Sequence, residues 1–425
     1  MFTLQSPGGS DLSKLIHRIR HLTARHGAGS LEQILVAVLN FGIVIVTGRL
    51  LAPSSFAIFV VIMSSLSLAF GLVSAVVSAP VLVLYRKRYH SAKRSYLGKL
   101  ELLNVGVSVA VGLVCLAIAF WVERRISSSD LVYSLLMLTA WSSYELRRKI
   151  AYALGEAPVL LLCSALVLLS AVISLGVTVF LGVASEGAVL LCLALSYLLG
   201  ILFFKLLTPR SDTTSKVPFQ VLLRDHWRFS HSLFSGLLLY WVASQGYFLV
   251  AARLLPDATL GGVRTAQNMA GLITTALLMF ENQATPMAAT LAHEGGDEAV
   301  RSWVRQLFDK GTWPFLAFVI LASLGAFGLH HFLYLKTYSQ FSWLAFIFAF
   351  HQFLLGLNRP YAVGLKAIEK TTPIFWGHCA GAALMVLGSW ILITYLGALG
   401  VAIGFVLSAS ALLLVLHLNF WRLTQ

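Results

Sequence analysis

The chain has 425 residues, of which 58% are hydrophobic and only 11% are charged, whereas an ordinary soluble domain carries about 25% charged residues. This composition excludes a soluble globular protein, because a soluble core could not bury so much apolar surface. The formal net charge of +14 does not require a nucleic-acid partner, because basic residues in a membrane protein first report orientation.

The apolar residues occur in long runs, each close to the ~20 residues that cross ~30 Å of hydrocarbon. We therefore predict an all-α integral membrane protein with about twelve spans. In chain order the predicted spans cover 31–51, 56–84, 98–122, 131–154, 158–182, 187–207, 231–252, 262–289, 311–333, 341–362, 373–396 and 399–421. The first thirty residues are polar and basic, so we expect an uncleaved first span and no cleavable signal peptide.

Positive charge is distributed unevenly between the two sides that these spans imply. Of the 31 Lys and Arg residues, those at or near the outer side are only Arg49, Arg124, Arg125, Arg253, Arg264 and Lys336. By the positive-inside rule, this bias predicts that both termini lie in the cytoplasm.

Three predicted cytoplasmic segments are amphipathic at helical spacing and are too polar to span. They are 12–22, 219–229 and 297–310, and we expect them to lie in the inner headgroup region. Residues 1–30 would then form a basic amphipathic cytoplasmic segment, and 208–230 a cytoplasmic linker that contains an amphipathic helix.

Short sequence matches recur at a nearly constant separation along the chain. RLLAP at the end of span 1 returns as RLLP at the end of span 7, SAP in span 2 returns as ATP in span 8, and RSYLGKL returns as RSWVRQL. The order is kept, so we predict two copies of one six-helix lobe, at 31–207 and 231–425. Because six is even, both copies run the same way through the membrane, and a substrate cleft between them is expected.

The segment RLLAPSSFAIF, from Arg49 to Phe59, and the basic stretch YRKRYHSAKR after span 2 resemble the oligosaccharide flippases of the multidrug/oligosaccharidyl-lipid/polysaccharide (MOP) exporter superfamily. The resemblance extends over the whole chain through the span count and the 6+6 layout. It implies alternating access between two lobes, which flips a polyprenyl-pyrophosphate-linked oligosaccharide across the bacterial inner membrane. The chain lacks the additional spans of peptidoglycan-precursor flippases, which argues against that substrate.

Polar side chains inside the predicted spans are the candidates for a substrate cavity, because phosphates need cations and sugar hydroxyls need hydrogen-bonding groups. The selected residues are Asn40 in span 1, Arg148 in span 4, Gln245 in span 7, Arg264, Gln267 and Asn268 in span 8, and His351, Arg359 and Lys366 in span 10.

Each candidate also has a structural interpretation. Gln and Asn side chains can serve only as interhelical hydrogen-bonding groups, and Arg148 can simply pair with Glu145 at i, i+3. Arg264 lies deeper in its span, so it is either a cavity-facing anion site or a structural residue.

Glu281 is a carboxylate about 8 residues, or ~12 Å, from the inner end of span 8. As a coupling site it would bind H⁺ or Na⁺ and tie ion entry to lobe motion. As a structural residue it would neutralise a cation such as Arg359.

We predict no metal site and no cofactor, because no His pairs with Cys, Asp or Glu at ligand spacing. The cysteines, Cys115, Cys163, Cys192 and Cys379, all lie inside apolar runs and lack the spacing of a disulfide framework.

Three functions compete. The first is a flippase for lipid-linked oligosaccharide, whose partners would be that substrate, membrane lipids and other proteins of polysaccharide assembly. The second is a cation-coupled multidrug exporter of the same superfamily, which needs membrane carboxylates that are scarce here. The third, a membrane polymerase, ligase or glycosyltransferase, is disfavoured because the predicted outer loops are too short to hold an acceptor and catalytic groups, so we expect no enzyme.

Overall fold

The structure is a computed structural model that describes residues 9–89, 92–154, 156–208, 217–334 and 337–424. This part of the chain is almost entirely helical and contains no strand. A lipid-embedded backbone cannot hydrogen-bond to water, and a helix satisfies every backbone group within one segment. The predicted all-α fold is confirmed.

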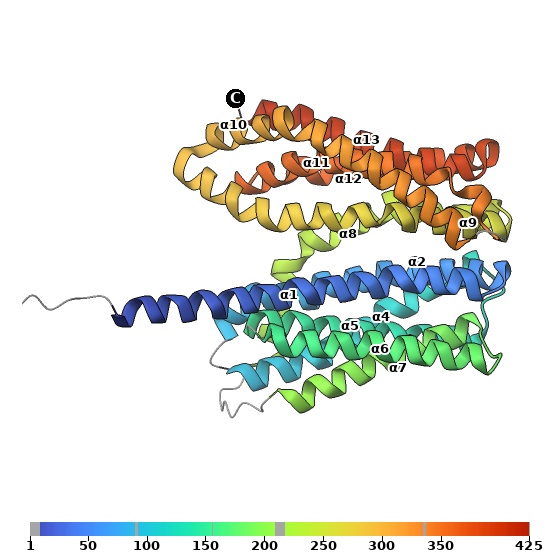
Figure 1. Cartoon of the computed structure of the whole chain (residues 1–425), viewed down its shortest axis with the longest axis horizontal. Helices are drawn as coiled ribbons and strands as arrows, with labels where there is room; N and C mark the ends of the chain where they lie inside the picture. The colour runs from blue at the N-terminus through green and yellow to red at the C-terminus, as the bar shows by residue number, and fades with distance from the viewer. Residues whose placement is uncertain (1–8, 90–91, 155, 209–216, 335–336, 425) are drawn as a thin grey trace, which may run out of the picture.

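The helices form two lobes, which lie side by side in Figure 1. The N-lobe contains α1 (Gly9–Leu50), α2 (Pro53–Val73), the π-helix η1 (Ser74–Ser78), α3 (Ala79–Leu84), the π-helix η2 (Tyr85–Tyr89), α4 (Lys93–Val122), α5 (Ser128–Leu154), α6 (Ala157–Phe180) and α7 (Glu186–Leu207). The C-lobe contains α8 (Phe219–Leu254), α9 (Asp257–Ala270), α10 (Leu272–Leu333), the 3₁₀ helix η4 (Ser339–Phe341), α11 (Leu344–Ala367), α12 (Thr372–Leu396) and α13 (Ala398–Leu423).

Gly296 divides α10 into two arms, 272–295 and 297–333, because its backbone leaves the helical region at φ 67° and ψ −162°. A positive φ of this kind is readily adopted only by glycine. The chain reverses at this point, as the bend of the yellow and orange ribbon in Figure 1 shows. The two arms therefore account for two of the predicted crossings.

Each of the twelve predicted spans coincides with helix to within three residues at its ends, and 262–289 runs from α9 into the first arm of α10. Nine helices in the described part of the chain are long and apolar enough to cross a membrane. The predicted spans outside this set are 131–154, 262–289 and 341–362, which carry Arg148, Glu281 and Arg359. Polar side chains lower the hydropathy of these three segments, so we expect them to face other helices or a cavity rather than lipid.

The first turn of α1 and the last turn of α13 lie at the same end of the molecule (Figure 1). We call this the terminal end and the opposite one the far end. An even number of crossings requires this arrangement, and the cytoplasmic location of the terminal end stays a prediction.

The first and third sequence matches fall at equivalent places in the two lobes. Arg49 and Arg253 lie in the last turns of α1 and α8. A proline opens the next helix in each lobe, Pro53 at the first position of α2 and Pro256 at the cap of α9, where its missing N–H and fixed φ are tolerated. The third match lies near the start of α4 and of the second arm of α10.

The three amphipathic segments are not separate helices. Residues 12–22, 219–229 and 297–310 are the first parts of α1, α8 and the second arm of α10, and each continues into an apolar crossing. Their location in the headgroup region stays a prediction. Of the predicted linker 208–230, residues 209–216 lie outside the described part of the chain, as does Lys336.

The start of α8 is attached to the N-lobe, although this helix belongs to the C-lobe. Asp225 accepts a hydrogen bond from the Tyr89 hydroxyl at 2.8 Å and pairs with the Arg88 guanidinium at 2.8 Å. Burial pushes the pKa of the Asp225 carboxyl upward, but the hydrogen bonds from Tyr89 and Arg88 outweigh it and hold the pKa below its usual value. The ion pair with Arg88 and the hydrogen bond from Tyr89 thus attach the end of the predicted linker to the N-lobe.

His226 adds a second attachment at the same place. Its side chain is fully buried, with Nε2 3.0 Å from the Tyr96 hydroxyl and Nδ1 3.0 Å from the Val76 carbonyl. A neutral ring that donates from Nδ1 to the carbonyl and accepts at Nε2 from Tyr96 satisfies both contacts. Burial lowers the pKa of His226, and the Val76 carbonyl and Asp225 offset this only in part.

Candidate functional site

One carboxylate in the C-lobe is shared by two cations. Glu281, in the first arm of α10, pairs with Arg359 of α11 and lies 2.7 Å from the Lys366 ammonium. The Glu281 side chain is 19% exposed and that of Lys366 is 42% exposed. The group carries a net charge of +1, so the ammonium of Lys366 still has donors available for an anion.

Arg264 lies in α9, seven residues or ~10 Å from the start of this helix. Its Nη1 donates to the side-chain oxygens of Gln245 at 3.0 Å and Gln267 at 2.9 Å. The guanidinium also lies 4.9 Å from the Phe248 ring centre, a favourable cation–π contact. No ion pair of the described chain includes Arg264, so its charge is held by dipoles and is not cancelled by a carboxylate.

Arg148 is part of a buried network inside the N-lobe. It forms a two-pronged pair with Glu32, with Nε and Nη2 2.7 and 3.0 Å from the two carboxylate oxygens, and Nη1 lies 2.5 Å from Glu145. Lys149 also contacts Glu145 at 3.2 Å. Two acids and two bases sum to zero charge, and this placement favours the structural interpretation of Arg148 over a cavity role.

Glu32 joins three helices through this network. In addition to Arg148 of α5, it accepts hydrogen bonds from Tyr152 at 2.6 Å and from Ser164 of α6 at 2.9 Å. It is completely buried. In the sequence, the only sign of this role is a carboxylate in an apolar run, because its main partner, Arg148, is 116 residues away.

The remaining candidates are Asn268, Asn40 and His351, and no hydrogen bond of the described residues joins them to one another. Asn268 donates to the Phe41 carbonyl of α1 at 3.2 Å and so connects the lobes, whereas Asn40 is exposed on α1. His351 is buried with its ring 5.3 Å from that of Phe405 in an edge-on contact. The predicted residues therefore form two cationic groups in the C-lobe, at Arg264 and at Glu281, and one neutral group in the N-lobe.

The lobes are joined at the far end by an ion pair that we did not predict. Arg125, in the α4–α5 loop, donates from both terminal nitrogens to Asp257 of α9, at 2.7 and 2.8 Å. Glu123 holds the same guanidinium at 2.7 and 2.9 Å. Hydrogen bonds from Arg125 outweigh burial and keep the pKa of Glu123 below its usual value.

Close packing reinforces this junction. Arg253 of α8 donates to the Trp121 carbonyl and lies over the Trp121 ring, 4.8 Å from its centre. A Cβ on Gly261 of α9 would lie 3.0 Å from the ring of Phe56 in α2 and 2.8 Å from the Tyr338 hydroxyl. The lobes are thus in van der Waals contact at the far end.

Metal-ligating side chains do not gather: the described residues hold no group of three or more His, Cys, Asp or Glu that could bind an ion. The four cysteines are free thiols, and three of them are buried.

No protein-family model and no curated protein matches the chain. Among solved structures, the inward-facing conformation of a multidrug resistance MATE family transporter of the MOP superfamily has a TM-score of 0.71 at 15% identity, covering 93% of this chain and 97% of that one. The outward-facing conformation of such a transporter has a TM-score of 0.62 at 15% identity, covering 93% and 94%.

The chain shares the fold of these transporters. A MOP superfamily transporter from Pyrococcus furiosus, described as having a binding pocket of reversed polarity that suggests a different function, also shares it, with a TM-score of 0.64 at 14% identity over 94% of this chain and 95% of that one. The fold expected from the resemblance is confirmed.

Proposed function

We propose that this protein is an alternating-access transporter of the bacterial inner membrane whose cargo is an anionic, lipid-linked solute, with a polyprenyl-pyrophosphate-linked oligosaccharide as the first candidate. The observation that carries this proposal is the charge balance inside the predicted spans. Their carboxylates, Glu32, Glu101, Glu145 and Glu281, all form ion pairs with Arg or Lys.

The unbalanced charges are all positive. Arg264 is held only by amide oxygens and an aromatic ring, and the Glu281 group keeps an extra cation. Guanidinium and ammonium groups in partly dehydrated surroundings bind phosphate well. A cationic drug would meet repulsion at both places.

Such transport needs relative motion of the two lobes, and lobes of six crossings can rock against each other. In the structure the lobes are joined at the far end. With the predicted topology, a lipid anion would enter from the inner leaflet and leave after the Arg125–Asp257 bridge has opened.

The second candidate is a cation-coupled multidrug exporter, and the comparisons of fold lie nearer to this candidate, because most of the similar structures are MATE transporters. Glu281 would then be the coupling carboxylate, and H⁺ or Na⁺ would compete with Arg359 and Lys366 for it. A Glu281→Gln variant that keeps full transport and normal pH dependence would exclude this role.

Gentle purification followed by mass spectrometry of co-purified lipids tests the cargo. A polyprenyl-pyrophosphate glycan supports the first candidate. Absence of such a lipid together with stabilisation by cationic drugs supports the second. Glycosyl transfer by the purified protein would contradict both.

A further inference from the structure

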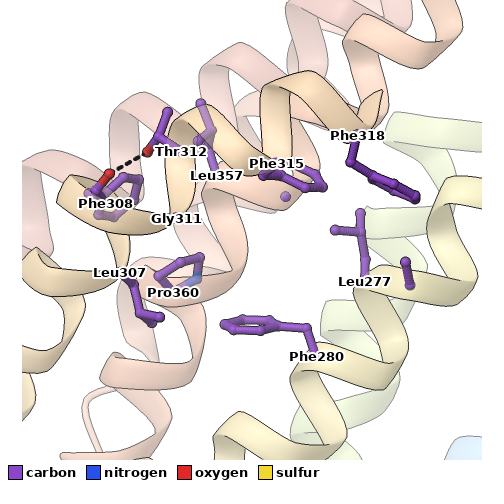
Figure 2. Close-up of a pocket in the computed structure, with 12 residues that line it drawn as sticks. Leu277, Phe280, Leu307, Phe308, Gly311, Thr312, Phe315, Phe318, Leu357 and Pro360 are labelled. Atoms are coloured by element: carbon purple, nitrogen blue, oxygen red, sulfur yellow. Dashed lines mark hydrogen bonds between the residues drawn. The ribbon is translucent and has the colours of Figure 1, made fainter. Parts of the chain in front are cut away.

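An apolar cavity lies within the C-lobe. It has a volume of about 320 Å³ and lies between the two arms of α10 and α11. Figure 2 shows the rings of Phe280, Phe308, Phe315 and Phe318 around the space. Thr312 also lines it, but its hydroxyl donates to the Phe308 carbonyl at 2.7 Å. The lining thus offers water few polar partners, and apolar cavities of this kind stay dry and accept apolar ligands.

The walls of the cavity are held in place by ring contacts and by glycines. Phe315 stacks on Phe353 at 5.6 Å and on Phe318 at 6.4 Å. A Cβ on Gly356 would lie 2.2 Å from the Phe315 ring, whereas a Cβ on Gly311 would meet nothing within 4 Å. The volume lies at the lower end of the ~300–1,000 Å³ typical of ligand sites. Phe318 is 43% exposed, so the cavity reaches the surface of the lobe.

The cavity lies next to the cationic group of the same two helices. Phe280 lines the cavity and Glu281 is the next residue; Pro360 lines it and Arg359 is the residue before. One face of each helix therefore presents hydrocarbon and the adjacent face presents charge, with an excess of one positive charge. This pairing matches a molecule that has an apolar chain and an anionic head.

We propose that the cavity binds the hydrocarbon chain of the transported lipid anion, while its phosphate lies at Arg359 and Lys366. The identity of this lipid as the cargo rests on the function proposed above. The positive charge excludes a cationic amphiphile, and the apolar lining excludes a sugar. The site gives the transporter a means to hold the lipid chain while the head passes between the lobes.

Gly311→Leu is the direct test, because the new side chain fills the cavity without a clash at Cβ. Each buried methylene contributes a factor of about four in affinity, so excluding two or more should weaken binding of a polyprenyl phosphate at least about ten-fold. Gly325→Leu is the matched control. It lies on the same arm of α10, away from the cavity, and its Cβ also meets nothing within 4 Å.

The probe is a polyprenyl phosphate with a photoreactive diazirine on its chain, added to the full-length protein in detergent. We expect cross-links within 276–280, 307–318 and 356–360, their loss in Gly311→Leu, and their retention in Gly325→Leu. Lys366→Gln should weaken binding of the phosphate but not of the neutral polyprenol. Melting temperatures of all variants check that they fold.

Equal affinity of Gly311→Leu and wild type, or cross-links elsewhere, would overturn the proposal. Complete displacement of the probe by an equal concentration of phosphatidylglycerol would also overturn it, because the occupant would then be a membrane phospholipid. Movement of a polyprenyl-linked glycan between leaflets of proteoliposomes is measured separately. If this movement persists while the cavity tests fail, the transport function stands and only the chain site is wrong.

Discussion

Replacing Asp257 by Asn should loosen the far end of the molecule. Arg125 makes two charge-assisted hydrogen bonds to Asp257, and the substitution keeps the shape of the side chain while removing its charge. Asn is also tolerated at the start of α9, where a helix exposes unpaired N–H groups. The variant therefore changes the junction between the lobes and little else.

The expected effect is moderate because the pair is partly solvated. The Arg125 side chain is 48% exposed and that of Asp257 is 31% exposed, so solvent screens the attraction. Exposed pairs contribute ~0.2–1 kcal/mol, and two-pronged geometry places this one near the upper limit, at about 1 kcal/mol. This free energy corresponds to about a five-fold change in the ratio of the closed to the open far end. The Arg253–Trp121 contact remains, so the far end should not open completely.

Spin labels on Ser128 and Gln340 report the distance between the lobes at the far end, since both residues are exposed there. We expect the population of longer distances to increase about five-fold in Asp257→Asn, and to increase in the wild type at high salt. Arg124→Gln is the control, because this neighbouring side chain lies over Phe120 of its own lobe. An unchanged distance distribution in Asp257→Asn would refute the role of the bridge.

Three further outcomes are expected. Arg264→Gln should reduce binding of an anionic cargo about 10- to 100-fold, because it removes one charged hydrogen bond of ~1.5–3 kcal/mol. The melting temperature should stay level or rise, because the removed charge has no acidic partner, and a marked fall in it would indicate a structural role. Glu32→Gln should destabilise the N-lobe by ~3–5 kcal/mol in chemical unfolding, since it leaves Arg148 buried with one acid, and an effect below 1 kcal/mol would contradict the buried network. Burial lowers the pKa of His226 from 6.5, so the neutral ring contributes fully to stability above pH 6.5 and this contribution is lost as the pH falls below it. The melting temperature should therefore fall more between pH 7.5 and 5.5 in the wild type than in His226→Gln.

The sequence predicted the class of fold and its division into lobes because both depend on local properties. A run of apolar residues forms a crossing wherever it occurs, and short matches such as RLLAP and RLLP mark equivalent helix ends without reference to packing. For the same reason, the polar interruptions at Arg148, Glu281 and Arg359 could be selected before their surroundings were known. Pairing of Glu281 with Arg359 is one of the two interpretations that the sequence allows, and the structure places the two residues in contact.

Packing decided what each of these residues does. Arg148 meets Glu32 from a helix far away in the sequence and becomes part of a neutral network, whereas Arg264 meets only amides and a ring. The far-end bridge depends on the relative position of the two lobes, and the apolar cavity depends on how the two arms of α10 pack against α11. Hydropathy is a property of each segment, but partners and cavities are properties of segments brought together, so only the tertiary structure could determine them.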